Sequence, residues 1–158
     1  MTMQSAYLVC VTLHILAAML WVGGMGFFAI VIVPVVRRSA APEKGRELMR
    51  AAGARFAKVG WLTLALLVAT GAGNLAFRGL LPALATAAFW SSSFGKTLAL
   101  KLALVITVFL VSAAHARAAR ASTSASGDRA GAASSGRVTL LLSLAVVVLG
   151  VFLVRGTP

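Results

Sequence analysis

The stretch AYLVCVTLHILAAMLWVGGMGFFAIVIVPVV, from Ala6 to Val36, decides the fold class because it contains no charged residue. A bilayer core about 30 Å thick requires roughly 20 apolar residues of helix, and this run exceeds that length. No basic residues precede it, as they would precede a secretory signal, and it is longer than the apolar part of such a signal. We therefore predict a retained membrane-spanning helix, long enough to tilt or to protrude.

Three further apolar runs cover residues 59–77, 97–116 and 138–154, and 60% of the whole chain is apolar. Each run is continuous and lacks the alternation of polar and apolar residues that spanning β-strands show, which excludes a membrane β-barrel. We predict an all-α integral membrane protein, an antiparallel four-helix bundle whose spans are residues 6–36 and these three runs. Residues 1–158 are expected to form a single membrane domain.

The net charge of +12 is distributed in a way that indicates membrane topology. Eleven of the fifteen cations fall between the first and second runs or between the third and fourth: Arg37, Arg38, Lys44, Arg46, Arg50, Arg55, Lys58, Arg117, Arg120, Arg129 and Arg137. These two loops share one side of an up-and-down bundle, and the positive-inside rule makes that side cytoplasmic. We predict a multi-pass protein of the bacterial inner (plasma) membrane with periplasmic termini. The cations are expected to face anionic lipid of the bilayer, not nucleic acid.

The segments between the runs differ in composition. Pro42 to Lys58 combines apolar and charged residues at helical spacing, which predicts a short amphipathic helix on the inner leaflet. Residues 117–136 are rich in Ala, Ser, Gly and Arg and contain no aromatic residue, which predicts a flexible cytoplasmic loop. Residues 79–95 carry Trp90, which we expect at headgroup depth in a short outer helix.

The three acidic residues, Glu43, Glu47 and Asp128, all fall in predicted loops, so no carboxylate lies inside a span. Their position excludes a carboxylate proton relay, a calcium or magnesium cage, and hydrolysis by paired carboxylates. The sequence also lacks a zincin pattern, a phosphate-binding glycine loop and a GxSxG elbow. We therefore do not expect the chemistry of a soluble enzyme.

The first run carries side chains that can bind a soft metal. Cys10 and His14 are four residues apart and share one helical face, while Trp21 and Met25 follow His14 by seven and eleven residues. Thiolate, imidazole and thioether suit copper(I), and imidazole or thioether also serves heme iron. The same stripe is equally typical of packing between helices, so a metal site and a packing role both stay open.

Asn74 and Lys101 are the polar residues of the second and third runs that helix rise places, like His14, in the outer third of the membrane. A lysine near a helix end can extend to the interface, but a third span that began after Lys101 would be too short. We predict an outer-leaflet site of His14 with Lys101 and Asn74 close by. His115 is expected at the cytoplasmic end, roughly 15–20 Å from His14 along the membrane normal.

Parts of three spans resemble the CopD copper-resistance membrane domain. Leu13-His14, Leu20 to Gly24, Phe27-Phe28 and Pro34 are similar to the opening helix of that family. Residues 56–79, which include Thr70-Gly71-Ala72-Gly73-Asn74, and residues 94–102 are similar to it as well. The resemblance covers about Leu13 to His115. It implies copper uptake or handling across the bacterial inner membrane, beside a periplasmic copper-binding partner.

A second resemblance is to the HemJ type of protoporphyrinogen oxidase, which implies heme b. That fold has a His and a Trp seven residues apart in its first helix and a lysine in its third, matching His14, Trp21 and Lys101. Its first helix ends in basic residues and histidine, where this chain has Val31 to Val36, so the CopD-like interpretation is preferred. A third hypothesis is a cofactor-free accessory subunit of a larger membrane complex. Each is compatible with a homo-oligomer.

Reporter fusions test the predicted topology. A reporter at Ser126 should read as cytoplasmic and one after Pro158 as periplasmic, because eleven cations lie in the two inner loops and three flank the outer ends. Paired alkaline phosphatase and fluorescent-protein fusions give the two readings. A cytoplasmic reading after Pro158 would contradict this topology and, with it, the shared depth of His14 and Lys101.

Overall fold

The computed structural model describes residues 2–38, 40–121 and 129–155. Within these residues the chain is helical apart from short turns, and it contains no strand, which confirms the all-α fold class. Four helical stretches in the described residues are long and apolar enough to cross a membrane: Met3–Arg37, Glu43–Phe77, Ser93–Ala114 and Gly136–Arg155. They match the four predicted spans, and the chain is a multi-pass membrane protein.

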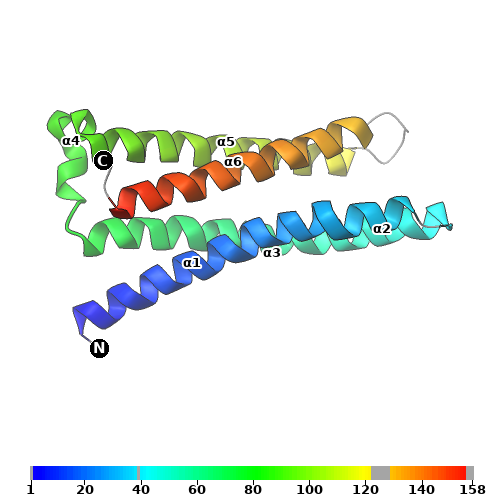
Figure 1. Cartoon of the computed structure of the whole chain (residues 1–158), viewed down its shortest axis with the longest axis horizontal. Helices are drawn as coiled ribbons and strands as arrows, with labels where there is room; N and C mark the ends of the chain where they lie inside the picture. The colour runs from blue at the N-terminus through cyan, green and yellow to red at the C-terminus, as the bar shows by residue number, and fades with distance from the viewer. Residues whose placement is uncertain (1, 39, 122–128, 156–158) are drawn as a thin grey trace. The chain divides into compact units, whose positions relative to one another are not determined.

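The helices form two compact units, residues 1–81 and 82–158, and each is described by itself. The single membrane domain expected for the whole chain stays a prediction. In the first unit the π-helical turn η1 joins two α-helices into one continuous rod, which packs along α3. The elements of this unit are α1 (Met3–Phe27), η1 (Phe28–Ile32), α2 (Val33–Arg37) and α3 (Pro42–Phe77) (Figure 1).

The second unit begins with two short helices and continues as a pair of long ones. Its elements are η2 (Pro82–Ala85), α4 (Ala87–Ser91), α5 (Ser93–Ala121) and α6 (Arg129–Arg155). The helices α5 and α6 lie side by side, and α4 packs on α5 (Figure 1). The short outer helix predicted around Trp90 is present as α4, and the indole Nε1 of Trp90 donates to the backbone oxygen of Leu84 at 2.9 Å.

Local signals in the sequence begin and end these helices. The Thr2 hydroxyl caps α1 by accepting from the backbone N–H of Ser5 at 3.3 Å. At the end of α3, Gly79 adopts a φ of 68°, where a side chain would be strained. Gly79 donates to the oxygen of Ala76 at 2.9 Å and Leu80 to that of Leu75 at 3.0 Å, which is a Schellman motif.

The π-helical turn η1 lies directly before a proline. Pro34 has no N–H to donate to the oxygen of Ile30, and its ring crowds that oxygen in a regular α-helix. The wider turn relieves this crowding, and the N–H of Val33 reaches back to the oxygen of Phe28. The rod from Met3 to Arg37 therefore stays continuous through the proline.

Two predicted segments differ in extent from the structure. The helix predicted over Pro42 to Lys58 is present, but it continues without a break into the second span as part of α3. Helix α5 reaches Ala121 and α6 starts at Arg129, so both helices extend into the predicted loop of residues 117–136. Alanine, the strongest helix former, is frequent at both ends of that stretch. The rest of the predicted loop lies outside the described residues.

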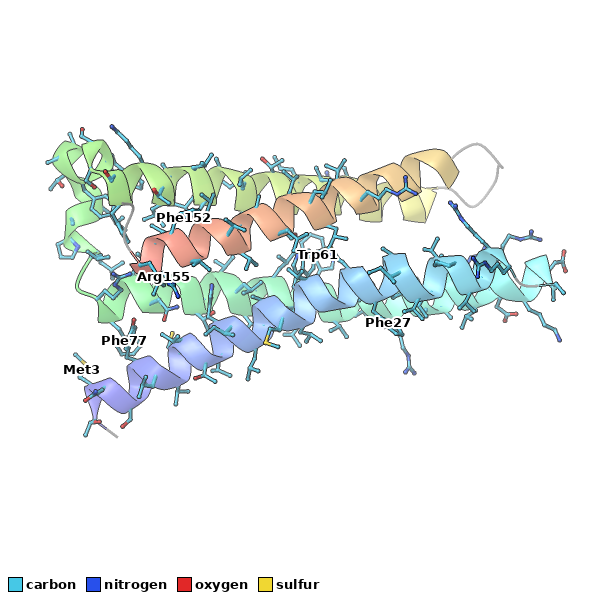
Figure 2. The ribbon with its side chains drawn as sticks, viewed as in Figure 1. Met3, Phe27, Trp61, Phe77, Phe152 and Arg155 are labelled. Atoms are coloured by element: carbon cyan, nitrogen blue, oxygen red, sulfur yellow. The ribbon has the colours of Figure 1, made fainter. Side chains whose placement is uncertain are left out.

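The rod and α3 run antiparallel and meet through aromatic rings and glycines. Figure 2 shows Met3 and Phe77 at the same end of this pair. The ring of Trp21 stacks on that of Phe56, with centroids 6.4 Å apart, and lies over Gly60. The ring of Phe56 in turn fills the space beside Gly24. Small residues of this kind allow two membrane helices to approach closely.

Two adjacent glycines of α1 provide a matched test of this packing. A Cβ atom at Gly24 would overlap the ring of Phe56, whereas a Cβ atom at Gly23 would meet nothing within 4 Å. Because Phe56 is held by Trp21 and by Phe28, whose ring centroid is 5.1 Å away, it cannot move aside freely. Gly24→Ala should therefore lower the free energy of unfolding by roughly 1–3 kcal/mol.

The control is Gly23→Ala, which should leave stability unchanged or raise it by up to about 1 kcal/mol through helix propensity. Thermal unfolding of both variants in the same detergent makes the comparison. Equal effects of the two substitutions would mean that the ring of Phe56 does not occupy the space beside Gly24.

Candidate functional site

Cys10 and His14 both approach a single residue of α3, Thr70. The Sγ atom of Cys10 donates to the backbone oxygen of Thr70 at 3.4 Å. The Nδ1 atom of His14 lies 2.8 Å from the Thr70 hydroxyl oxygen. The thiol and the imidazole, which the sequence places on one face of α1, therefore converge on one turn of the neighbouring helix.

The Thr70 hydroxyl determines which nitrogen of His14 carries a proton. Its Oγ1 atom donates its one proton to the backbone oxygen of Leu66 at 2.6 Å, so toward His14 it acts as an acceptor. We therefore assign the proton to Nδ1 of His14, which leaves the lone pair of the neutral ring on Nε2. Histidines that bind a metal ion through one nitrogen are commonly oriented by such a bond from the other.

Two glycines of α3, Gly71 and Gly73, lie beside these side chains. The Sγ atom of Cys10 lies 2.8 Å from the position that a Cβ atom would take at Gly73. The corresponding distance from Cε1 of His14 to a Cβ at Gly71 is 3.5 Å, an ordinary van der Waals contact. Gly73 is therefore required for the position of Cys10, whereas Gly71 is not required for that of His14.

Asn74, another predicted site residue, lies on the same part of α3. It follows Gly73 directly and lies one helical turn beyond Thr70. Its Oδ1 atom is buried and accepts no hydrogen bond within the described part of the chain. Because a buried polar atom without a partner is costly, this oxygen is suited to accept a hydrogen bond from a bound group.

Trp21 and Met25 lie further along α1. Trp21 is buried, as expected for a packing residue, and its ring lies over Gly60 of α3. Met25 follows His14 by eleven residues, about 16 Å along the helix axis. The structure therefore does not bring Met25 to the pair of Cys10 and His14.

Lys101 lies in the second unit, on α5. Its side chain is directed at α6, where Nζ lies 3.3 Å from the position of a Cβ atom at Gly150. It thus packs against a helix of the protein, as expected for a charged residue within a span. Its predicted proximity to His14, which belongs to the first unit, stays a prediction. His115 follows Lys101 on α5 by fourteen residues, about 21 Å along the axis.

The described residues contain no group of three or more His, Cys, Asp or Glu side chains that could hold a metal ion. Glu43 and Glu47 lie exposed in the first turns of α3, and Asp128 lies outside the described residues. A metal ion at the α1–α3 contact would therefore have two donors of this type from the described chain, Cys10 and His14.

Comparison with protein-family models, with curated proteins and with solved structures found no match to this chain.

Thr70 is the residue of the candidate site that sequence reasoning missed. A threonine inside a span usually satisfies its hydroxyl on the preceding turn of its own helix, so it attracts no attention as a polar residue. The signal that could have found it is position, because Thr70 and Asn74 are four residues apart and share a face of α3. The pairing with His14 itself could not be read from the sequence, because it depends on the register of α1 against α3.

The two glycines beside Cys10 and His14 provide a matched pair of variants. Gly73→Ala should displace the Cys10 side chain, because a Cβ atom 2.8 Å from Sγ is closer than such contacts allow. The loss of its bond to Thr70 should change the rate at which a membrane-permeant maleimide alkylates Cys10, by roughly threefold or more. Gly71→Ala, whose Cβ makes an ordinary contact, should leave that rate unchanged.

Mass spectrometry of timed reactions measures both rates, and Cys10 is the one cysteine in the chain. Equal rates in the wild type and in Gly73→Ala would show that Cys10 does not pack against α3 at this position.

Proposed function

We propose that this protein handles copper(I) within the bacterial inner membrane, with Cys10 and His14 as the residues that bind the ion. The observation that supports the proposal is the convergence of a thiol and an imidazole on Thr70, in a protein whose described residues include four helices able to span a membrane. In this proposal copper is a substrate that the protein takes up or passes on, and not a resident cofactor. The resemblance of the spans to the CopD family supports the same role.

The two donors suit copper(I) by chemistry and by spacing. Thiolate is a soft ligand that selects copper(I), and imidazole is an accepted second ligand. A metal ion bound to one sulfur and one nitrogen holds these atoms roughly 4 Å apart. Side chains four residues apart on a helix have Cβ atoms about 5–6 Å from each other, so Cys10 and His14 can share one ion.

Binding would exchange one set of interactions for another. The thiol of Cys10 would lose its proton, and with it the bond that it donates to Thr70. The bond from Nδ1 of His14 to the Thr70 hydroxyl can persist, because Nε2 is the nitrogen that would face the ion. Thr70 therefore acts as a positioning residue that keeps His14 oriented in both states.

The position of the pair along α1 favours access from the outer side. Cys10 and His14 follow the start of α1 at Met3 by seven and eleven residues, about 10 and 16 Å. Under the predicted topology this end of the helix is periplasmic, so a periplasmic copper-binding protein is the expected donor. Deeper along the same contact, the stacked rings of Trp21 and Phe56 fill the space between the helices.

A second candidate function is heme b binding, as the HemJ resemblance implies. It is favoured by the bond between Nδ1 of His14 and Thr70, because an axial histidine needs Nε2 directed at iron just as a copper ligand does. The unpartnered Oδ1 of Asn74 could then accept a hydrogen bond from a group bound nearby.

Copper(I) binding by the purified chain tests the primary proposal. In competition with a chromophoric copper(I) chelator, Cys10→Ser and His14→Ala should each lower the affinity by more than about tenfold, because each removes one of two donors. Thr70→Val should lower it by about 10-fold to 100-fold, the range typical of residues that orient a metal ligand. Thr70→Ser, which keeps the hydroxyl, should bind as the wild type does.

His115→Ala is the matched control, because it removes the other histidine of the chain. Full copper affinity in both Cys10→Ser and His14→Ala would overturn the copper site. A Soret band that is lost in His14→Ala and kept in Cys10→Ser would support heme instead. Retention of copper, heme and complementation in both His14→Ala and Lys101→Met would leave the accessory subunit as the surviving hypothesis.

A further inference from the structure

Apolar and basic side chains occur together at one end of the first unit, the end that contains the turn after α2. They lie at the same position along the axes of the paired helices. The ring centroids of Phe28 and Phe56 are 5.1 Å apart, and this contact fixes the register of the rod against the antiparallel helix α3 at this end. The residues after Phe28 therefore run beside the residues before Phe56, and α2 packs on this part of α3. We refer to residues 27–38 and 40–58 together as the basic hairpin.

One set of side chains in the basic hairpin is apolar and exposed. On the first rod, the exposed fractions are 55% for Phe27, 76% for Ile30 and 60% for Val35. Leu48 of α3 is also exposed. Figure 2 shows Phe27 on the part of the rod away from Met3. Exposed apolar side chains of this kind are stable in contact with acyl chains and unfavourable in water.

The second group is cationic. The basic hairpin contains seven cations and two acids, a net charge of +5, and all seven cations are exposed: Arg37, Arg38, Lys44, Arg46, Arg50, Arg55 and Lys58. Arg46 forms an ion pair with Glu43 at 3.4 Å, but both side chains are largely exposed, so the pair is weak. The charge of this surface is therefore largely uncompensated by the hairpin itself.

The length of α3 shows where these cations lie relative to a bilayer. Its 36 residues extend about 54 Å, whereas the hydrocarbon core is about 30 Å thick. An upright α3 would carry the basic segment well beyond the core, and Ile30 and Val35 would then be in water at the same level. A hairpin that tilts into the interface removes this conflict, because its apolar residues stay among acyl chains while its cations reach the headgroups.

We propose that the basic hairpin is a binding surface for anionic phospholipids of the adjacent leaflet. The lipid phosphates contact the exposed arginines and lysines, and the acyl chains cover Phe27, Ile30 and Val35. Charge complementarity and the apolar length in excess of the bilayer favour lipid over an acidic soluble protein, which would leave these apolar side chains in water. The proposal does not depend on copper or heme binding.

The depth of the apolar group is tested with the full chain in phospholipid vesicles. A bimane label is attached at Ile30→Cys in a Cys10→Ser background, and a second at Glu47→Cys. Nitroxides on the acyl chains should quench the label at residue 30 more strongly than aqueous iodide does. A nitroxide on the headgroup should quench the label at residue 47 most. Stronger quenching by iodide than by acyl nitroxides at residue 30 would overturn the proposal and favour a soluble partner.

The preference for anionic lipid is tested in vesicles of equal parts phosphatidylcholine and phosphatidylglycerol. A bimane label is attached at Val35→Cys. Its quenching is measured once with the acyl nitroxide on phosphatidylcholine and once with the same nitroxide on phosphatidylglycerol. The wild-type hairpin should favour phosphatidylglycerol, and Arg50→Gln with Arg55→Gln should reduce that preference severalfold. The upper bound for the loss is about 25-fold, since each cation near an anionic surface contributes about fivefold.

The matched control is Lys96→Gln with Arg155→Gln, which removes the same charge from cations outside the basic hairpin. It should leave the lipid preference at residue 35 unchanged. Equal quenching by the two lipids in the wild type would overturn the proposal. An equal loss in the control variant would also overturn it, because the preference would then follow net charge and not this surface.

Discussion

The close approach of α1 to α3 is the constraint on which the first unit depends. It is possible because glycine occupies the positions where rings or sulfur of the other helix arrive: Gly24 beside Phe56, Gly60 beneath Trp21 and Gly73 beside Cys10. Inside a bilayer, water does not drive apolar helices together, so close packing and hydrogen bonds must hold them. Glycines at these points allow both, and they also set the register that brings Cys10 and His14 to Thr70.

Thr70 links the packing of this contact to its chemistry. Its hydroxyl donates within its own helix and accepts from His14, while its backbone oxygen accepts from Cys10. One residue therefore orients both side chains that could bind a soft metal. Within the described residues, Oδ1 of Asn74 is a buried side-chain atom without a hydrogen-bond partner, and it is the place where a bound group would add a bond.

The sequence was sufficient for the fold class and for the spans, because a continuous apolar run near 20 residues long is rarely anything except a membrane-spanning helix. It also placed Cys10 and His14 on one face, since that follows from helical spacing alone.

The sequence could not give Thr70 as their partner, Gly60 as the glycine beneath Trp21, or Gly150 as the neighbour of Lys101. These contacts depend on how two helices are shifted and rotated against each other, and neither quantity is encoded in the periodicity of one helix. The helix over Pro42 to Lys58 was predicted, but its unbroken continuation into the second span was not, because charged residues and a glycine precede the apolar run, although all of them are compatible with helix.

The π-helical turn η1 has a consequence for how the first span is aligned with other sequences. A π-helical turn holds about one residue more than an α-helical turn, so the residues that follow it are rotated by roughly 100° from the positions of an uninterrupted helix. A helical wheel drawn from Met3 through to Arg37 therefore assigns the wrong faces after Ile32. Loss of a single residue between Phe28 and Ile32 would convert η1 into an α-helical turn, which leaves Arg37 in about its present direction but presses the ring of Pro34 against the preceding turn. Insertions or deletions at this point should accordingly occur together with replacement of the proline.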